Sequence, residues 1–91
     1  MASSVEAFDK FRMWKKSRTV LKVTVLTKGG YPNILTGEVV SVIEETFSVG
    51  FLDPKTRKAW VNDFRDASFR LGKRSLEAER STGELLMVEE L

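Results

Sequence analysis

Residues 21–71 decide the fold of this chain: LKVTVLTKGGYPNILTGEVVSVIEETFSVGFLDPKTRKAWVNDFRDASFRL. In the first run, Leu21, Val23 and Val25 alternate with polar residues, which is the period of a strand that buries one face. Further short apolar runs follow, and turn residues separate them. Short strands at this spacing are typical of a small, strongly bent antiparallel barrel with an open, SH3-like architecture.

The sequence predicts five strands, and turn signals set several of their boundaries. Residues 28–33 contain Gly and Pro, which permit or fix the backbone of a turn, and residues 53–56 place Pro at the second position of another turn. Gly37 lies inside the second run, where a residue without Cβ marks a sharp bend or a bulge. We expect the strands at residues 19–27, 34–44, 47–52, 58–62 and 67–71.

An amphipathic helix is predicted before the first strand, at residues 4–16. Ser3 and Glu6 form the Ser-x-x-Glu pattern of a capping box, which satisfies the free amides at the start of a helix. Apolar residues then recur at every third position, and we expect this stripe to pack in the core while the helix covers one open end of the barrel. The stripe consists of Val5, Phe8, Phe11 and Trp14.

The end of the chain predicts a second helical segment. Residues 75–91 favour helix, with an interruption at residues 81–83. We therefore divide the chain into a barrel domain with its N-terminal helix, residues 1–74, and an acidic, helix-prone extension, residues 75–91. The apolar side of the last short helix would consist of Leu85, Leu86, Val88 and Leu91.

The composition of the 91 residues excludes several classes of function. The chain has no Cys and no His, so disulfides, the usual His/Cys metal sites and Ser-His or Cys-His nucleophiles are excluded. We therefore expect no enzyme activity, no cofactor or metal, and no small-molecule substrate. No apolar run approaches the ~20 residues of a membrane span, and the start lacks the apolar core of a signal peptide, so we expect a cytoplasmic protein without a membrane partner.

The net charge of +2 is unevenly distributed along the chain. Residues 10–28 contain Lys and Arg and no acidic residue, whereas residues 75–91 contain several Glu and Arg80 as their basic residue. This distribution would guide a polyanion to one face, and two solvated segments of opposite charge are the alternative. The basic surface that we expect consists of Lys15, Lys16, Arg18, Lys55 and Arg57.

The order of a helix and five strands, with Gly37 in a long second strand, resembles the Sm-like family. This family includes the eukaryotic Sm and Lsm proteins, archaeal Sm-like proteins and bacterial Hfq. The resemblance covers about residues 5–72. Its second motif corresponds here to Phe64-Arg65-Asp66, followed by Ala67 and Phe69. Its first motif corresponds to Gly37, Val39, Val42, Glu44, Phe47, Ser48, Val49 and Phe51, with one residue inserted before Glu44.

The resemblance implies a site for single-stranded RNA, formed by two neighbouring loops. Phe47 would stack on a base, Ser48 would contact the edge of the base, and Arg65 would support the pocket. The family has Asn at the position of Ser48 and Gly at the position of Asp66, so the base-edge contact and the charge of the pocket differ here. The alternatives are that Phe47 continues the core face of its strand and that Arg65 pairs with Asp63 or Asp66.

The resemblance also implies a homo-oligomeric ring of about five to seven subunits, closed by head-to-tail contacts between edge strands. The interface would consist of Trp60, Val61, Phe69 and Leu71. Two other functions stay open. One is a ring that binds protein and lacks the RNA pocket, and the other is an SH3-like or Tudor-like module that binds a peptide with Trp60 and Tyr31.

Overall fold

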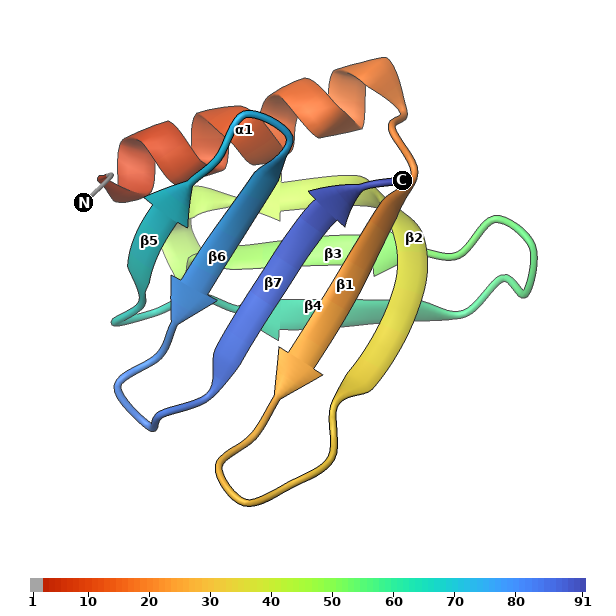
Figure 1. The fold of residues 1–91 in the computed structure, drawn as a ribbon. Helices are drawn as coiled ribbons and strands as arrows, with labels where there is room; N and C mark the ends of the chain where they lie inside the picture. The colour runs from red at the N-terminus through yellow and green to blue at the C-terminus, as the bar shows by residue number, and fades with distance from the viewer. Residues whose placement is uncertain (1–2) are drawn as a thin grey trace.

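The computed structural model describes residues 3–91 and shows a helix above an open, strongly curved antiparallel sheet (Figure 1). The elements are α1 (Ser4–Ser17), β1 (Leu21–Leu26), β2 (Asn33–Ile43), the 3-10 turn η1 (Glu44–Thr46), β3 (Ser48–Leu52), β4 (Ala59–Asp63), β5 (Ser68–Leu71), β6 (Ser75–Glu79) and β7 (Leu85–Glu90). The prediction of a mainly β fold with an N-terminal helix is confirmed. The sheet has seven strands, in the order β4-β3-β2-β1-β7-β6-β5, where the sequence predicted five.

The N-terminal helix α1 begins as the sequence predicts and buries the three aromatic residues of the predicted stripe, but the prediction that Val5 packs in the core is wrong. The Ser3 hydroxyl accepts a hydrogen bond from the amide of Glu6 at 3.2 Å, and the carboxylate of Glu6 accepts one from the amide of Ser3 at 3.3 Å. The helix ends at Ser17, and Arg18 caps it with a φ of 55°, in the left-handed region. Val5 is exposed, so the buried side of α1 consists of Ala7, Phe8, Phe11 and Trp14.

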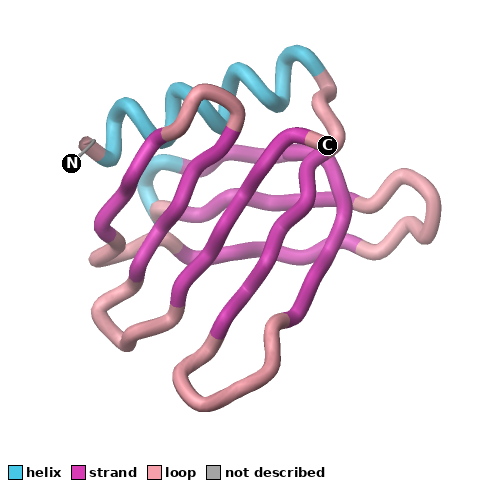
Figure 2. The backbone as a smooth tube through the Cα atoms, viewed as in Figure 1, coloured by secondary structure: helices cyan, strands magenta, loops and turns pink. Residues whose placement is uncertain are grey.

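Strand β2 joins the two halves of the sheet. It pairs with β1 up to Gly37 and with β3 from Glu38 onward, and the register shifts between Val39 and Ser41. A Cβ at Gly37 would lie 2.9 Å from the carbonyl oxygen of Leu52 and 2.9 Å from a ring carbon of Trp60. A residue without Cβ therefore allows β3 and β4 to approach β2 where it curves from one half into the other (Figures 1 and 2).

The core lies between the two halves of the sheet and beneath α1. Phe11 packs on Phe64, with ring centroids 5.1 Å apart, and edge-on against Phe51 at 6.3 Å. The indole Nε1 of Trp14 donates a hydrogen bond to the carboxylate of Glu90 at 3.0 Å, which ties α1 to the last strand. The buried Leu and Val residues of the core are Leu21, Val23, Val39, Val49, Leu76, Leu86 and Val88.

The prediction of a helical C-terminal segment is wrong. Residues 75–90 form the hairpin of β6 and β7, and β7 pairs with β1 from Leu21 to Leu26. In β6, Leu76 and Ala78 alternate with Glu, and in β7 the buried Leu86 and Val88 alternate with more exposed residues, which is the period of a strand. Gly83, with φ 92°, lies in the turn between them. The proposed extension therefore belongs to the same sheet as residues 21–71.

The ends of the sheet are the edge strands β4 and β5. A link of residues 64–67 connects them, and the sheet is not closed. Within residues 3–91, α1 is the α-helix, and with 14 residues it is neither long nor apolar enough to cross a membrane.

Candidate nucleic-acid interface

Two turns from distant parts of the chain meet at one end of β3 and β4. The amide of Phe64 donates a hydrogen bond to the carbonyl oxygen of Phe47 at 2.8 Å, and Ser48 pairs with Asp63 in the β3–β4 register. The turn that carries Phe47 therefore adjoins the turn that carries Arg65. This arrangement brings together the residues that the resemblance assigned to one RNA site.

The side chain of Phe47 is 39% exposed, and it does not continue the core face of β3. Phe47 has φ 53° and precedes β3, so it is a turn residue, and the expectation that it begins the strand is wrong. Its ring centroid lies 6.0 Å from that of Phe8, which is buried in α1. The core thus supports the ring on one side while part of it stays accessible to a base.

The hydroxyl of Ser48 is engaged within its own turn. It donates to the carbonyl oxygen of Thr46 at 3.2 Å and accepts from the hydroxyl of Thr46 at 2.9 Å. Because a Ser hydroxyl has a single hydrogen-bond donor, and Ser48 donates it to Thr46, Ser48 cannot also donate to the edge of a base. Ser48 therefore stabilises the turn that presents Phe47.

Arg65 is exposed, and none of the ion pairs among residues 3–91 includes its guanidinium. Asp63 binds the neighbouring backbone instead, because its carboxylate accepts the amide of Arg65 at 2.8 Å. Asp66 has φ 60°, a backbone conformation that favours Gly, and it stands where the resemblance has Gly. The guanidinium is thus presented beside two carboxylates without a salt bridge to either.

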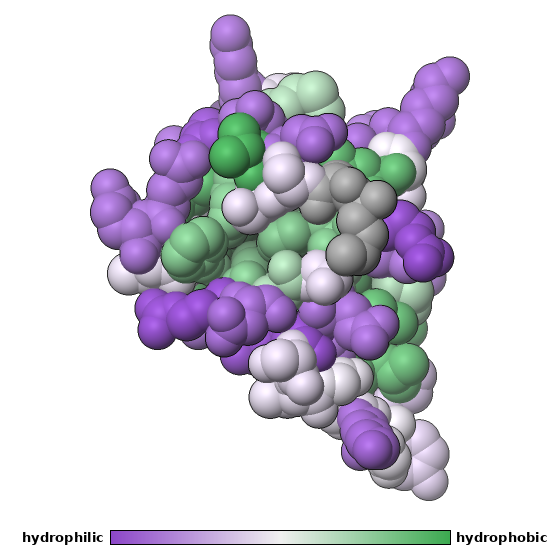
Figure 3. Space-filling view, turned by 90° about the vertical axis from the view of Figure 1, so that its left-hand side faces the viewer, coloured by the Kyte–Doolittle hydropathy of each residue, from purple (hydrophilic) through white to green (hydrophobic). Residues whose placement is uncertain are grey.

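Acidic residues surround these turns, and the positive charge of Arg12 offsets part of their negative charge. Arg12 forms an ion pair with Glu44 and another, at 2.8 Å, with Asp9. The hydrogen bond with Glu44 is the main cause of a raised pKa for Arg12. Viewed from this end, the molecule presents apolar side chains in the middle and hydrophilic ones around them (Figure 3).

The predicted basic surface lies at the other end of β3 and β4. Lys15, Lys16 and Arg18 lie at the end of α1, whereas Lys55 and Arg57 lie in the turn between β3 and β4, and all five are exposed. The end of α1 and this turn lie on the same side of the molecule (Figure 1). The guanidinium of Arg18 pairs with Glu38 at 3.4 Å. Within one chain, β3 therefore separates the basic surface from Phe47.

The four predicted interface residues differ in exposure. Val61 is 67% exposed, whereas Phe69 is 3% exposed and packs on Phe64, with ring centroids 5.9 Å apart. Trp60 stacks on Phe51 at 5.3 Å and donates from Nε1 to Asn62 at 3.0 Å. Leu71 is half-buried against the core.

The aromatic contacts do not support the alternative in which Trp60 and Tyr31 together form a peptide-binding groove. Tyr31 is 93% exposed in the turn between β1 and β2, while the ring that stacks on Trp60 is Phe51. The aromatic pairs among the described residues do not include Tyr31.

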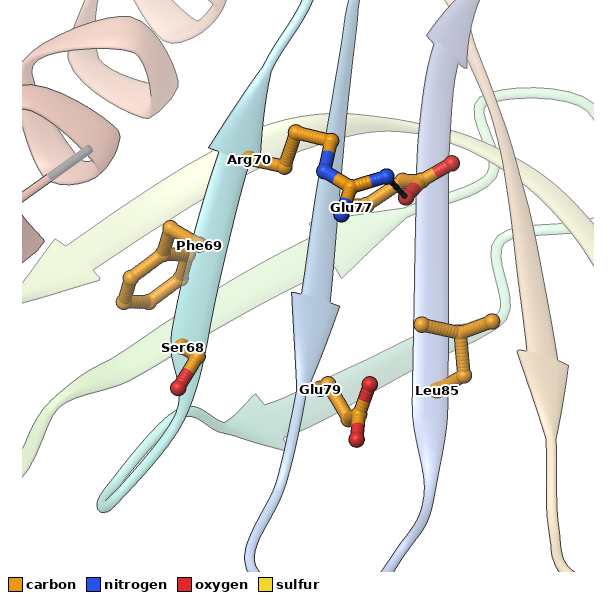
Figure 4. A pocket seen from close by; sticks show the side chains of 6 residues that line it. All are labelled: Ser68, Phe69, Arg70, Glu77, Glu79 and Leu85. Carbon is orange, nitrogen blue, oxygen red and sulfur yellow. Dashed lines mark ion pairs between the residues drawn. The ribbon is translucent and has the colours of Figure 1, made fainter. Parts of the chain in front are cut away.

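A shallow hollow of about 220 Å³ lies on β5, β6 and β7 (Figure 4). Arg70 and Glu77 form an ion pair of 3.9 Å at one side of it, and Leu85 and Glu79 lie at the other. The part of the chain that the structure describes has no cluster of three acidic, His or Cys residues that fits a metal ion. The sequence did not indicate this hollow, because residues 75–91 were expected to be helical.

Comparison of the chain with protein-family models, with curated proteins and with solved structures finds no match.

Proposed function

We propose that this protein binds single-stranded RNA at the end of β3 and β4 where Phe47 and Arg65 lie. The observation that carries the proposal is the hydrogen bond from the amide of Phe64 to the carbonyl of Phe47, 2.8 Å long. It holds an accessible aromatic ring and an unpaired guanidinium on adjoining turns. This pair of groups suits one nucleotide, with the ring on the base and the cation on the phosphate.

The same geometry favours weak discrimination between bases. Stacking on an aromatic ring tolerates every base, and the donor of Ser48 is held by Thr46. Asp63 and Asp66 beside Arg65 limit the attraction for phosphate. We therefore expect binding that depends on stacking more than on base sequence, with salt-dependent help from the basic surface.

Fluorescence anisotropy of a labelled oligouridine tests this proposal. We expect Phe47→Ala to weaken binding by about 5- to 150-fold, because a stacked base contributes about 1–3 kcal/mol. Arg65→Ala should weaken binding most at low salt, since its contribution is to phosphate.

The matched controls replace an aromatic residue and an arginine elsewhere on the surface. Tyr31→Ala and Arg70→Ala should bind oligouridine like the wild type, because both side chains are exposed and lie on other elements. Wild-type affinity in Phe47→Ala, or an equal loss in Tyr31→Ala, would contradict the proposal.

A second candidate function is protein–protein interaction through the edges of the sheet. Two features favour it: Val61 is 67% exposed on the edge strand β4, and carboxylates flank Arg65. The ring that the resemblance implies would use β4 and β5 together. Light scattering of the protein without RNA measures whether any such assembly forms.

A further inference from the structure

The free edge of β4 has the properties of a strand that recruits a partner. Among residues 3–91, β4 pairs with β3 alone, and its sequence Ala59–Asp63 contains no Pro and a single charge, at its last residue. Natural sheets protect edges with Pro, charges, bulges or a covering element, and an unprotected edge pairs with another strand. Val61 also exposes an apolar side chain beside this edge.

The other edge strand is better protected. β5 has four residues, and α1 packs against it. At its end the ammonium group of Lys10 donates to the carbonyl oxygens of Gly72 and Lys73, at 3.0 and 3.2 Å. Of the two edges, β4 is therefore the one that is free to pair.

The hydrogen bonds at both ends of β4 identify which main-chain groups face outward. The amide of Phe64 binds Phe47, and the amide of Asp53 binds the carbonyl of Lys58, so both pairs belong to the hydrogen-bonded set of the β3–β4 ladder. These pairs alternate along antiparallel strands. The main-chain groups of Ala59, Val61 and Asp63 therefore point away from β3, toward the free edge.

We propose that β4 pairs antiparallel with β4 of a second copy of this chain, about a two-fold axis. Hydrogen bonds between the two copies form only where outward main-chain groups of one β4 face outward main-chain groups of the other. This condition places Ala59 opposite Val61 of the second copy and Trp60 opposite Trp60. The exposed Arg57, which lies in the turn just before β4, then comes near Asp63 of the second copy, twice by symmetry. The sheets of the two copies become continuous.

Charge selects this register over the neighbouring one. A shift that places Val61 opposite Val61 would put Asp63 opposite Ala59 of the second copy, so Asp63 would lose the opposite charge that stabilises a cross-strand pair. One carboxylate oxygen of Asp63 already binds the amide of Arg65, and the carboxylate retains capacity for Arg57.

Charge also disfavours the head-to-tail contact of a ring. Antiparallel pairing of β4 with β5 of another copy, in full overlap, would bring the turn that carries Arg57 near the turn that carries Lys73 and place Asp63 beside Asp66. No opposite charges would face one another. The pairing that we infer joins β4 of one copy to β4 of the other. Neither copy then has a free β4 for a third copy, so the assembly is a dimer.

The dimer would unite the two surfaces that one chain keeps apart. In the inferred register, the start of β4 of one copy meets the end of β4 of the other, so the basic turn that carries Lys55 adjoins the partner's turn that carries Arg65, next to Phe47. This consequence rests on the proposed RNA binding, since a phosphate chain would relieve the repulsion between these cations. Each RNA site would then contain residues of both copies.

Sedimentation equilibrium without RNA tests the pairing. We expect twice the chain mass of 10.3 kDa. Val61→Pro removes an outward amide and leaves the bonds to β3 in place, so it should give a folded monomer, while Val61→Thr should remain a dimer. A monomeric wild type, a ring, or a dimeric Val61→Pro would overturn the inference.

A charge exchange tests the register. Arg57→Asp and Asp63→Arg should each weaken the dimer, and the variant with both changes should restore it, because the two charges face each other again. Absence of this rescue, with folded variants, would overturn the register.

An RNA titration separates the pairing from the proposed function. Monomeric Val61→Pro should bind oligouridine ~10-fold or more weakly, because it loses the phosphate contacts of the second copy. A dimer that binds no oligouridine would refute the proposed function and leave the pairing intact. Equal affinity of the monomer and the dimer would refute the shared site.

Discussion

Gly37 shows how one residue determines the curvature of the sheet. A Cβ at this position would lie 2.9 Å from the main-chain oxygen of Leu52 and 2.9 Å from the ring of Trp60, and neither the sheet backbone nor the stacked indole can move freely. We expect Gly37→Ala to lower the free energy of unfolding by about 1–3 kcal/mol, as overpacking does. Urea unfolding measures this change.

Gly50, in the neighbouring strand β3, provides the matched control. A Cβ there would meet the hydroxyl oxygen of Ser41, which is the end of a side chain that can rotate. Gly50→Ala should therefore destabilise the protein less than Gly37→Ala. An equal or smaller loss for Gly37→Ala would contradict the role of Gly37 at the bend.

The lowered pKa of Asp53 predicts that the stability of the protein depends on pH. Its carboxylate accepts the amides of Lys55 at 2.8 Å and Thr56 at 3.4 Å, and the bond from Lys55 is the main cause of a lowered pKa for Asp53. A group with a lowered pKa stabilises the folded state above its unfolded pKa and loses this contribution as the pH falls through the folded value. The difference in unfolding free energy between wild type and Asp53→Asn should therefore be largest at neutral pH and shrink below about pH 4.

Urea unfolding of both proteins at pH 7 and pH 3 checks this prediction. A difference that stays constant between the two pH values would mean that the charge of Asp53 does not stabilise the turn.

Phe47 illustrates a limit of sequence interpretation at the residue scale. Alternation with Val49 and Phe51 placed it on the core face of the strand, but its φ of 53° ends η1 and turns the side chain outward. A positive φ at a bulky residue is rare and leaves no pattern in one sequence. The engagement of Ser48 with Thr46 likewise appears only in three dimensions.

The elements that local signals define were predictable. The capping box at Ser3 and the aromatic stripe of α1 act within a few residues, and both are confirmed. The turn at Asp53 and the bend at Gly37 also follow from residue type.

The C-terminal hairpin was not predicted, because its conformation depends on a distant partner. Residues 75–91 are rich in Leu and Glu, which favour helix, yet Leu86 and Val88 pair with Val25 and Val23 of β1. Burial against β1 overrides this local preference. Residues 81–83, which the sequence predicted to interrupt this helical segment, form the turn between β6 and β7.

Leu86→Ala tests the position of β7 within the sheet. Leu86 is buried, so we expect a loss of about 2–5 kcal/mol in the free energy of unfolding. Met87, the next residue, points to the other face and is half-buried, so Met87→Ala should cost less. Equal, small effects in chemical denaturation would indicate that β7 contributes little to the core.

At the scale of the whole molecule, long-range pairing sets the arrangement of the site. β1 lies between β2 and β7, which places the edges at β4 and β5 and leaves the basic surface and Phe47 at opposite ends of β3. The sequence, through its resemblance, indicated that the Phe47 and Arg65 turns meet. It did not indicate that the basic residues lie elsewhere, because their separation depends on the direction of β3.

Amide chemical-shift mapping tests the central claim, RNA binding at the Phe47 and Arg65 turns, most directly. The ¹⁵N-labelled protein would be titrated with a short oligouridine at low and moderate salt. We expect the amide signals of Phe47, Ser48 and Arg65 to shift and to saturate together. Unchanged signals at these residues, with or without shifts elsewhere on the molecule, would contradict the account.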